Sequence, residues 1–263
     1  MAEGATLEAI LKRDRAIVLA GLAVLSALAW TYLLVLAWRM PHRDMAMMMA
    51  MPHMQDWGAP EVLLTWVMWA VMMIAMMTPT AAPMILTFTT IYRRRRAQQG
   101  PFVSTVVFLL GYLLIWVAFS GVATLAQWGL HTAALLSPMM VSTSPILGGI
   151  LLLAAGIFQW TPLKSTCLTQ CRSPLGFLMT EWREGAWGAL LMGLRHGSYC
   201  VGCCWVLMAL LFVAGVMNLL WVAAIAAFVL VEKVLPRGEL VGRVAGGVLT
   251  LAGLALLGQR WLT

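Results

Sequence analysis

The sequence predicts an all-α, polytopic membrane protein with about seven transmembrane helices, or six, and a cytoplasmic N-terminus. Of its 263 residues, 62% are hydrophobic and only 10% are charged, and the mean hydropathy is +0.89. A soluble domain would carry about 25% charged residues. Apolar runs of about 20 residues, each able to cross a hydrocarbon core about 30 Å thick, fill most of the chain. We therefore expect one integral membrane domain over residues 1–263.

The predicted spans follow one another with short connections. They cover residues 16–38, 61–92, 102–125, 144–158, 186–216, 219–235 and 244–257. The first run is too long for a removable signal peptide, so we expect it to be retained. The second should be interrupted at residues 78–83, because Pro79 and Pro83 each remove a backbone donor. The fifth contains Arg195 and His196 and is alternatively an interfacial helix followed by a span.

Basic residues set the predicted orientation. The net charge is +7, but Lys and Arg lie in short blocks beside the apolar runs, where they determine topology, so we expect no nucleic-acid partner. Seven spans place Lys12, Arg13, Arg15, Arg93, Arg94, Arg95, Arg96, Lys164, Arg172, Arg183, Lys233, Arg237 and Arg243 inside, against Arg39, Arg43 and Arg260 outside. This asymmetry favours a multi-pass protein of the bacterial inner membrane, with the lipid bilayer as a partner.

A methionine-rich segment follows the first span, in the external loop predicted over residues 39–60. Its candidate ligands are Met40, His42, Met45, Met47, Met48, Met49, Met51, His53 and Met54, and the triplet Met-Pro-His occurs twice. Thioethers bind Cu(I), and they do so in oxidising compartments where thiols would be cross-linked. The segment is therefore interpreted as a copper-collecting loop. The alternative is a flexible methionine patch that packs against lipid.

The second span continues the methionine pattern. Met68, Met72 and Met76 are spaced four residues apart, which puts successive thioethers about 6 Å apart along one side of a helix. This ladder either passes a soft ion between weak sites or packs against neighbouring helices.

All five cysteines lie between residues 167 and 204. Cys167 and Cys171 belong to a predicted cytoplasmic loop over residues 161–185, whereas His196, Cys200, Cys203, Cys204 and Met208 follow at helical spacing in the fifth span. Gly193, Gly197 and Gly202 should let a neighbouring helix or loop approach. In a reducing compartment these thiols would accept Cu(I). They are alternatively small buried hydrophobes, or a zinc site, which would give no reason for the methionines.

Two further observations concern charge and catalysis. Glu232 and Lys233 are expected to form a local ion pair, with Lys233 reaching the headgroups. The chain shows no Ser-His-Asp set, phosphate-binding glycine loop or paired carboxylates, so we expect neither an enzyme nor an ATP-driven pump.

The cysteine segments resemble a bacterial family described as predicted metal-binding integral membrane proteins. The matching residues are Lys164, Cys167, Cys171, Arg172 and Pro174, then Gly193, His196, Gly197, Cys200, Val201, Gly202, Cys203, Cys204, Trp205 and Met208, then Gly215, Val216, Met217 and Asn218, and finally Glu232 and Lys233. The resemblance covers roughly residues 60–260. The chain is also similar to membrane proteins that help load copper into tyrosinase-type enzymes. These resemblances imply metal binding in the membrane and copper delivery.

The sequence thus favours a Cu(I)-binding inner-membrane protein that transports or delivers copper for cuproenzyme assembly or copper homeostasis. Its partners would be the copper ion and a cuproenzyme or periplasmic copper carrier. One alternative is a thiol-disulfide carrier that uses Cys167 with Cys171 and Cys200 with Cys203. Another is a structural subunit of a membrane complex. The direction of copper movement and the oligomeric state are left open.

Overall fold

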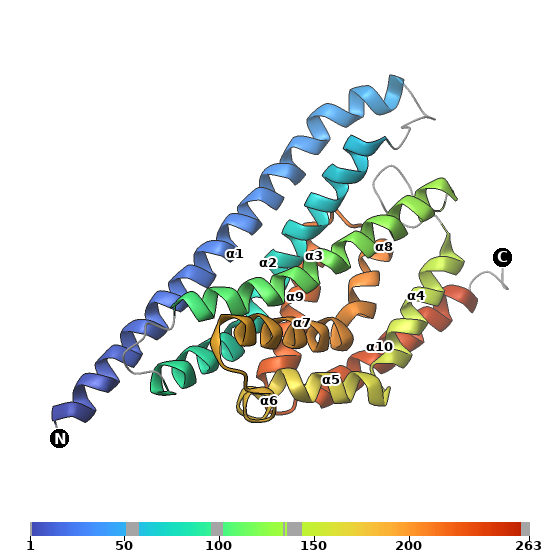
Figure 1. Cartoon of the computed structure of the whole chain (residues 1–263). Coiled ribbons are helices and arrows are strands. Elements are labelled where there is room, and N and C mark those ends of the chain that lie inside the picture. Colours follow the sequence, from blue (N-terminus) through green and yellow to red (C-terminus); the bar gives the residue numbers. More distant parts are fainter. Residues whose placement is uncertain (1, 51–57, 96–101, 134, 136–143, 259–263) are drawn as a thin grey trace.

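The computed structural model describes residues 2–50, 58–95, 102–133, 135 and 144–258, and every regular element among them is an α-helix (Figure 1). The side chains of residues 2–7 and 39–50 are outside this description. The helices are α1 (Ala2–Ala50), α2 (Ala59–Arg95), α3 (Phe102–Thr132), α4 (Pro145–Phe158), α5 (Pro162–Arg172), α6 (Pro174–Glu181), α7 (Gly185–Ala209), α8 (Leu211–Ala214), α9 (Leu219–Val234) and α10 (Gly238–Gly258). The predicted all-α class is confirmed.

Five helical segments in the described part of the chain are long and apolar enough to cross a membrane. They are Glu8–Trp38, Ala59–Arg95, Phe102–Thr132, Gly185–Ala214 and Gly238–Gly258. The pair α4 and α5, bent by 63° at its break, would be a sixth. The predicted sixth span, over residues 219–235, corresponds to α9, which has only 16 residues and is not among these segments. Large apolar side chains such as Leu64, Val122 and Leu251 are more than 60% exposed, as expected for helices that face lipid.

Three predicted features differ from the observed helices. α1 continues to Ala50, so the first part of the predicted external loop is helical. Residues 161–185, predicted as a loop, contain α5 and α6. The run over residues 186–216 begins with the single helix α7, which carries both Arg195 and His196. An interfacial helix followed by a separate span is therefore wrong. The length of an apolar run predicts where a span lies. It does not predict helices that are polar on one side and pack against the spans.

α2 is continuous through both of its prolines, so the predicted interruption is also wrong. Pro79 lacks the N–H group that would bond to the carbonyl oxygen of Ala75. The hydroxyl group of Ser26 in α1 donates to this oxygen instead, at 3.5 Å. Hydroxyl side chains from neighbouring helices commonly replace such lost bonds inside membranes.

Glycines bring α3 and α7 into backbone contact. A Cβ atom on Gly197 would lie 2.9 Å from Cβ of Ile115 and 3.0 Å from the carbonyl oxygen of Tyr112, and one on Gly193 would lie 3.1 Å from the nitrogen of Tyr112. No larger residue fits at either position without displacing backbone. The prediction that these glycines permit a close approach is confirmed, and the contact places Tyr112 beside α7.

A buried ionic group fixes the break between α4 and α5. Lys164 Nζ at the start of α5 lies 2.6 Å from Glu232 Oε1 in α9 and also donates to Oε1 of Gln159, which lies in the break. The carboxylate faces Gly242 of α10, where a side chain would displace it. This group therefore holds α5 against α9 and α10, and α5 carries two of the cysteines.

Candidate metal centre

The predicted copper-collecting segment lies at the end of α1 and beyond it. The backbone of residues 40–50 belongs to α1, whereas the side chains of Met40, His42, Met45, Met47, Met48 and Met49 are outside the described part, as are Met51, His53 and Met54 altogether. Copper binding by this segment stays a prediction.

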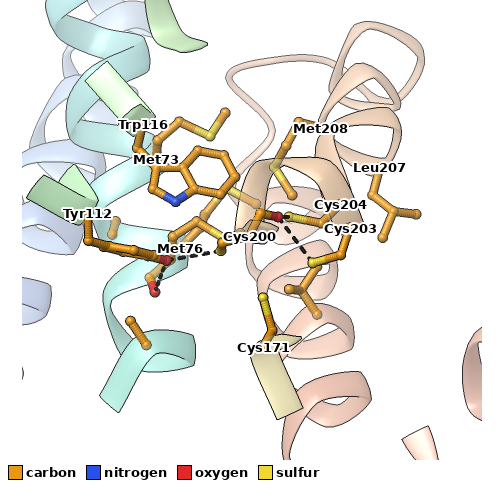
Figure 2. Packing of buried hydrophobic residues seen from close by; sticks show 14 of the residues in the cluster. Met73, Met76, Tyr112, Trp116, Cys171, Cys200, Cys203, Cys204, Leu207 and Met208 are labelled. Carbon is orange, nitrogen blue, oxygen red and sulfur yellow. Dashed lines mark hydrogen bonds between the residues drawn. The ribbon is translucent and has the colours of Figure 1, made fainter. Parts of the chain in front are cut away.

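The methionine ladder lies on the buried side of α2. Met68, Met72 and Met76 are 5%, 1% and 1% exposed. With 1.5 Å of rise per residue, Met68 and Met76 lie about 14 Å and 26 Å along the helix from Ala59. Met73 is also buried, and Figure 2 labels it with Met76 among the side chains around Cys200. These thioethers pack the interior, as the alternative interpretation predicts.

Four cysteines form one buried group between α5 and α7. This thiol cluster consists of Cys171, Cys200, Cys203 and Cys204, all free and buried. The side chains of Cys171 and Cys204 each interact electrostatically with those of Cys200 and Cys203. Cys203 and Cys204 also donate to the carbonyl oxygen of Cys200 at 3.1 Å and 3.0 Å (Figure 2). The structure thus joins residues from both predicted cysteine segments.

Cys167 lies at the edge of this group. It precedes Cys171 by one turn of α5, and a Cβ atom on Gly202 of α7 would lie 2.8 Å from its sulfur. Gly202 therefore lets α5 approach α7, as predicted. Met208, 1% exposed, extends the set of soft ligands along α7 on the side of Cys204 (Figure 2).

A lysine reaches the thiol cluster from α9. Lys233 Nζ donates to Sγ of Cys200 at 2.9 Å and to Oγ1 of Thr80 at 3.3 Å. Its residue is 8% exposed, so it does not extend to the headgroups, and Glu232 pairs with Lys164 instead. The predicted local ion pair is wrong because consecutive residues on a helix point in different directions.

Tyr112 joins three helices at the same point. Its hydroxyl group, carried by α3, donates to the carbonyl oxygen of Met77 in α2 at 3.1 Å and lies 3.2 Å from Sγ of Cys200 in α7. A single hydroxyl group thus connects the methionine helix to the thiol cluster. Sequence reasoning missed this residue, since an isolated tyrosine in an apolar run gives no signal.

His196 lies one turn before Cys200, inside a set of aromatic rings. Its ring stacks on Tyr112 and Phe108 at centroid distances of 5.5 Å and 6.2 Å and meets the edge of Phe177 at 5.6 Å. Its Nδ1 atom is buried and has no hydrogen-bond partner among the described residues. The imidazole is therefore held by packing, with one nitrogen left as an available ligand.

Sulfur-containing side chains are gathered here, but the described residues do not form a complete metal coordination sphere. Among the residues that the structure describes, no group of three or more His, Cys, Asp or Glu side chains is arranged to hold a metal ion. A structural zinc site would require four such ligands in tetrahedral geometry. Cu(I) accepts fewer and prefers sulfur, so neighbouring thiols and thioethers fit Cu(I) better than zinc.

Comparison with protein families yields a match to a family model described as PpoB2, copper chaperone, over residues 66–256. The matched range begins in α2 before Met68 and includes the whole thiol cluster and Lys233. No curated protein and no solved structure matches the chain.

Proposed function

Because the chain belongs to the PpoB2 copper chaperone family, we propose that it is a Cu(I)-binding protein of the bacterial inner membrane that transports or delivers copper for cuproenzyme assembly or copper homeostasis. Copper is its cargo, and the protein performs no catalysis. The family supports a copper-related role, and the residues below support the finer assignment.

One observation carries this proposal: sulfur ligands from three helices meet in a single buried region. The thiol cluster combines Cys171 of α5 with three cysteines of α7, and Tyr112 connects Cys200 to the methionine helix α2. Packing alone would not require thiols and thioethers to gather. A soft monovalent ion does require them.

The predicted orientation of the helices supports a route for the copper ion along α2. With the N-terminus in the cytoplasm, α2 starts at the external side and ends at the basic residues Arg93, Arg94 and Arg95 on the internal side. The ladder then descends from Met68 to Met76 towards the level of the thiol cluster. Thiolates bind Cu(I) more strongly than thioethers, so this order favours inward binding. The external segment over residues 40–54 would exchange copper with a periplasmic carrier or a cuproenzyme.

The burial of the cysteines argues against the thiol-disulfide carrier. Such a carrier exchanges disulfides with another protein by attack of one thiolate on an accessible sulfur. All five cysteines here are buried, and Cys200, Cys203 and Cys204 are at most 1% exposed. The thiol of a protein partner cannot reach sulfur atoms that are buried to this extent.

Anaerobic titration with Cu(I) against a competing chelator tests the proposal. We expect the purified wild type to bind Cu(I), and Cys171→Ser with Cys200→Ser to abolish the tight site. Cys167→Ser, at the edge of the cluster, is the matched control and should retain most of the affinity. Cys200→Ser with Cys204→Ser should lower bound Cu(I) more than Glu232→Gln. A wild type that does not compete for Cu(I) would refute the proposed function.

Loss of Cu(I) binding in two stages would distinguish binding by the external segment from binding by the thiol cluster. Replacing all methionines over residues 40–54 by leucine should remove weak binding and leave the tight site intact. Unchanged metal content after this replacement would favour a purely structural segment.

A further inference from the structure

The two lysines buried near the break have different partners. Lys164 is neutralised by Glu232 at 2.6 Å. Among the described residues, the hydrogen-bond partners of Lys233 Nζ are the sulfur of Cys200 and the hydroxyl group of Thr80, and no carboxylate lies within 4.0 Å of this atom. A buried cation needs a nearby anionic group, most of all inside a membrane. The structure places the ammonium group of Lys233 directly against the sulfur of Cys200, a residue type that ligates metals as thiolate.

The net charge of the loaded site depends on the charge of the metal ion. Cysteine binds metal as thiolate. Two thiolates that hold one Cu(I) form a complex with a net charge of −1, and the ammonium group of Lys233 balances it. A divalent ion held by the same two thiolates would give a neutral complex and leave Lys233 uncompensated.

We propose that Lys233 is a specificity-determining residue that makes the thiol cluster prefer monovalent over divalent metal ions. This inference rests on the proposed function, since it assumes that the cluster binds Cu(I). The repulsion between the ammonium group and the ion grows with the charge of the ion. For any fixed number of thiolates, a divalent ion therefore experiences one more unit of repulsion from Lys233 than Cu(I) does.

Three variants of the full-length protein separate charge from packing and hydrogen bonding. Lys233→Met removes the charge and keeps most of the side-chain volume. Lys233→Gln also removes the charge but retains a donor for Thr80 and Cys200, and it serves where the methionine variant folds poorly. Thr80→Val is the matched control, because it removes the other partner of Lys233 and leaves the charge in place.

Competition titrations with Cu(I) and with Zn(II) give the ratio of the two affinities for each protein. We expect Lys233→Met and Lys233→Gln to weaken Cu(I) binding and to shift the ratio at least about tenfold towards Zn(II), because one unit of buried charge interaction is lost. Thr80→Val should leave the ratio within about threefold of the wild type, since the charge is retained.

The outcomes distinguish this inference from the proposed function. A wild type that binds Cu(I), combined with an unchanged ratio in both Lys233 variants, would overturn the role of Lys233 alone. The same holds if both affinities fall by the same factor, because that result indicates a general disturbance of the site. A wild type without competitive Cu(I) binding would overturn the proposed function itself.

Discussion

Breaking the buried pair between Lys164 and Glu232 should destabilise the protein strongly. The two charged atoms lie 2.6 Å apart, and the side chains are only 3% and 2% exposed. Glu232→Gln leaves the ammonium group of Lys164 buried without a counter-charge, next to Gln159 alone. Removing one partner of such a pair costs about 3–5 kcal/mol, because the remaining charge loses its compensation but not its desolvation cost.

Thermal unfolding in detergent provides the measurement. At about 2–4 °C per kcal/mol for soluble domains of this size, Glu232→Gln and Lys164→Met should each lower the melting temperature by about 6 °C or more. The double variant should recover at least half of the loss, since it buries no unpaired charge. The control is Glu8→Gln, which breaks the exposed pair between Lys12 and Glu8 and should change stability by less than about 1 kcal/mol.

Two results would refute this reasoning. The first is a Glu232→Gln variant as stable as the Glu8→Gln control, which would mean that water reaches the pair. The second is a double variant whose loss equals the sum of the single losses, since independent contributions exclude a coupled pair.

Two further predictions concern the helices around the thiol cluster. Met72→Leu with Met76→Leu should cost less than about 1.5 kcal/mol in stability because the side-chain volume is conserved, but it should weaken Cu(I) binding in the chelator titration. The control is Met179→Leu, which changes an exposed methionine. An unchanged Cu(I) affinity would mean that the ladder only packs the interior. Tyr112→Phe should lower the free energy of unfolding by about 0.5–1.5 kcal/mol, because the carbonyl oxygen of Met77 loses one hydroxyl donor while Thr80 still donates to it. Unfolding in detergent tests this change, and a phenylalanine variant as stable as the wild type would contradict the shared hydrogen bond.

The helical class and part of the cysteine arrangement were predictable because both follow from local geometry. Long apolar runs must form helices in a membrane, where every backbone group needs an internal partner. Cys200, Cys203 and Cys204 are three and four residues apart, so any helix places them together. The glycines at positions 193 and 197 likewise predict a close contact between helices, and in the structure α3 packs against them.

The remaining parts of the site depend on tertiary packing and gave no local signal. Cys171 reaches the cluster because residues 162–172 form a helix that turns by 63° from α4 and packs against α7. That turn is held by Glu232, which is distant in the sequence. Lys233 follows Glu232 directly, and adjacency in the sequence suggested a pair that helical geometry forbids. Tyr112 acquires its role only when three helices converge.

The two buried lysines have different partners, one that stabilises the fold and one that belongs to the proposed copper site. Lys164 has a permanent counter-charge, so its pair with Glu232 can hold α5 in place whether or not metal is present. Lys233 faces Cys200, which belongs to the proposed copper site. Under the proposed function, two thiolates and one Cu(I) carry a net charge of −1, which the ammonium group of Lys233 balances. A site built in this way binds its ion inside the membrane without leaving a net buried charge, and it does so for an ion of one positive charge rather than two.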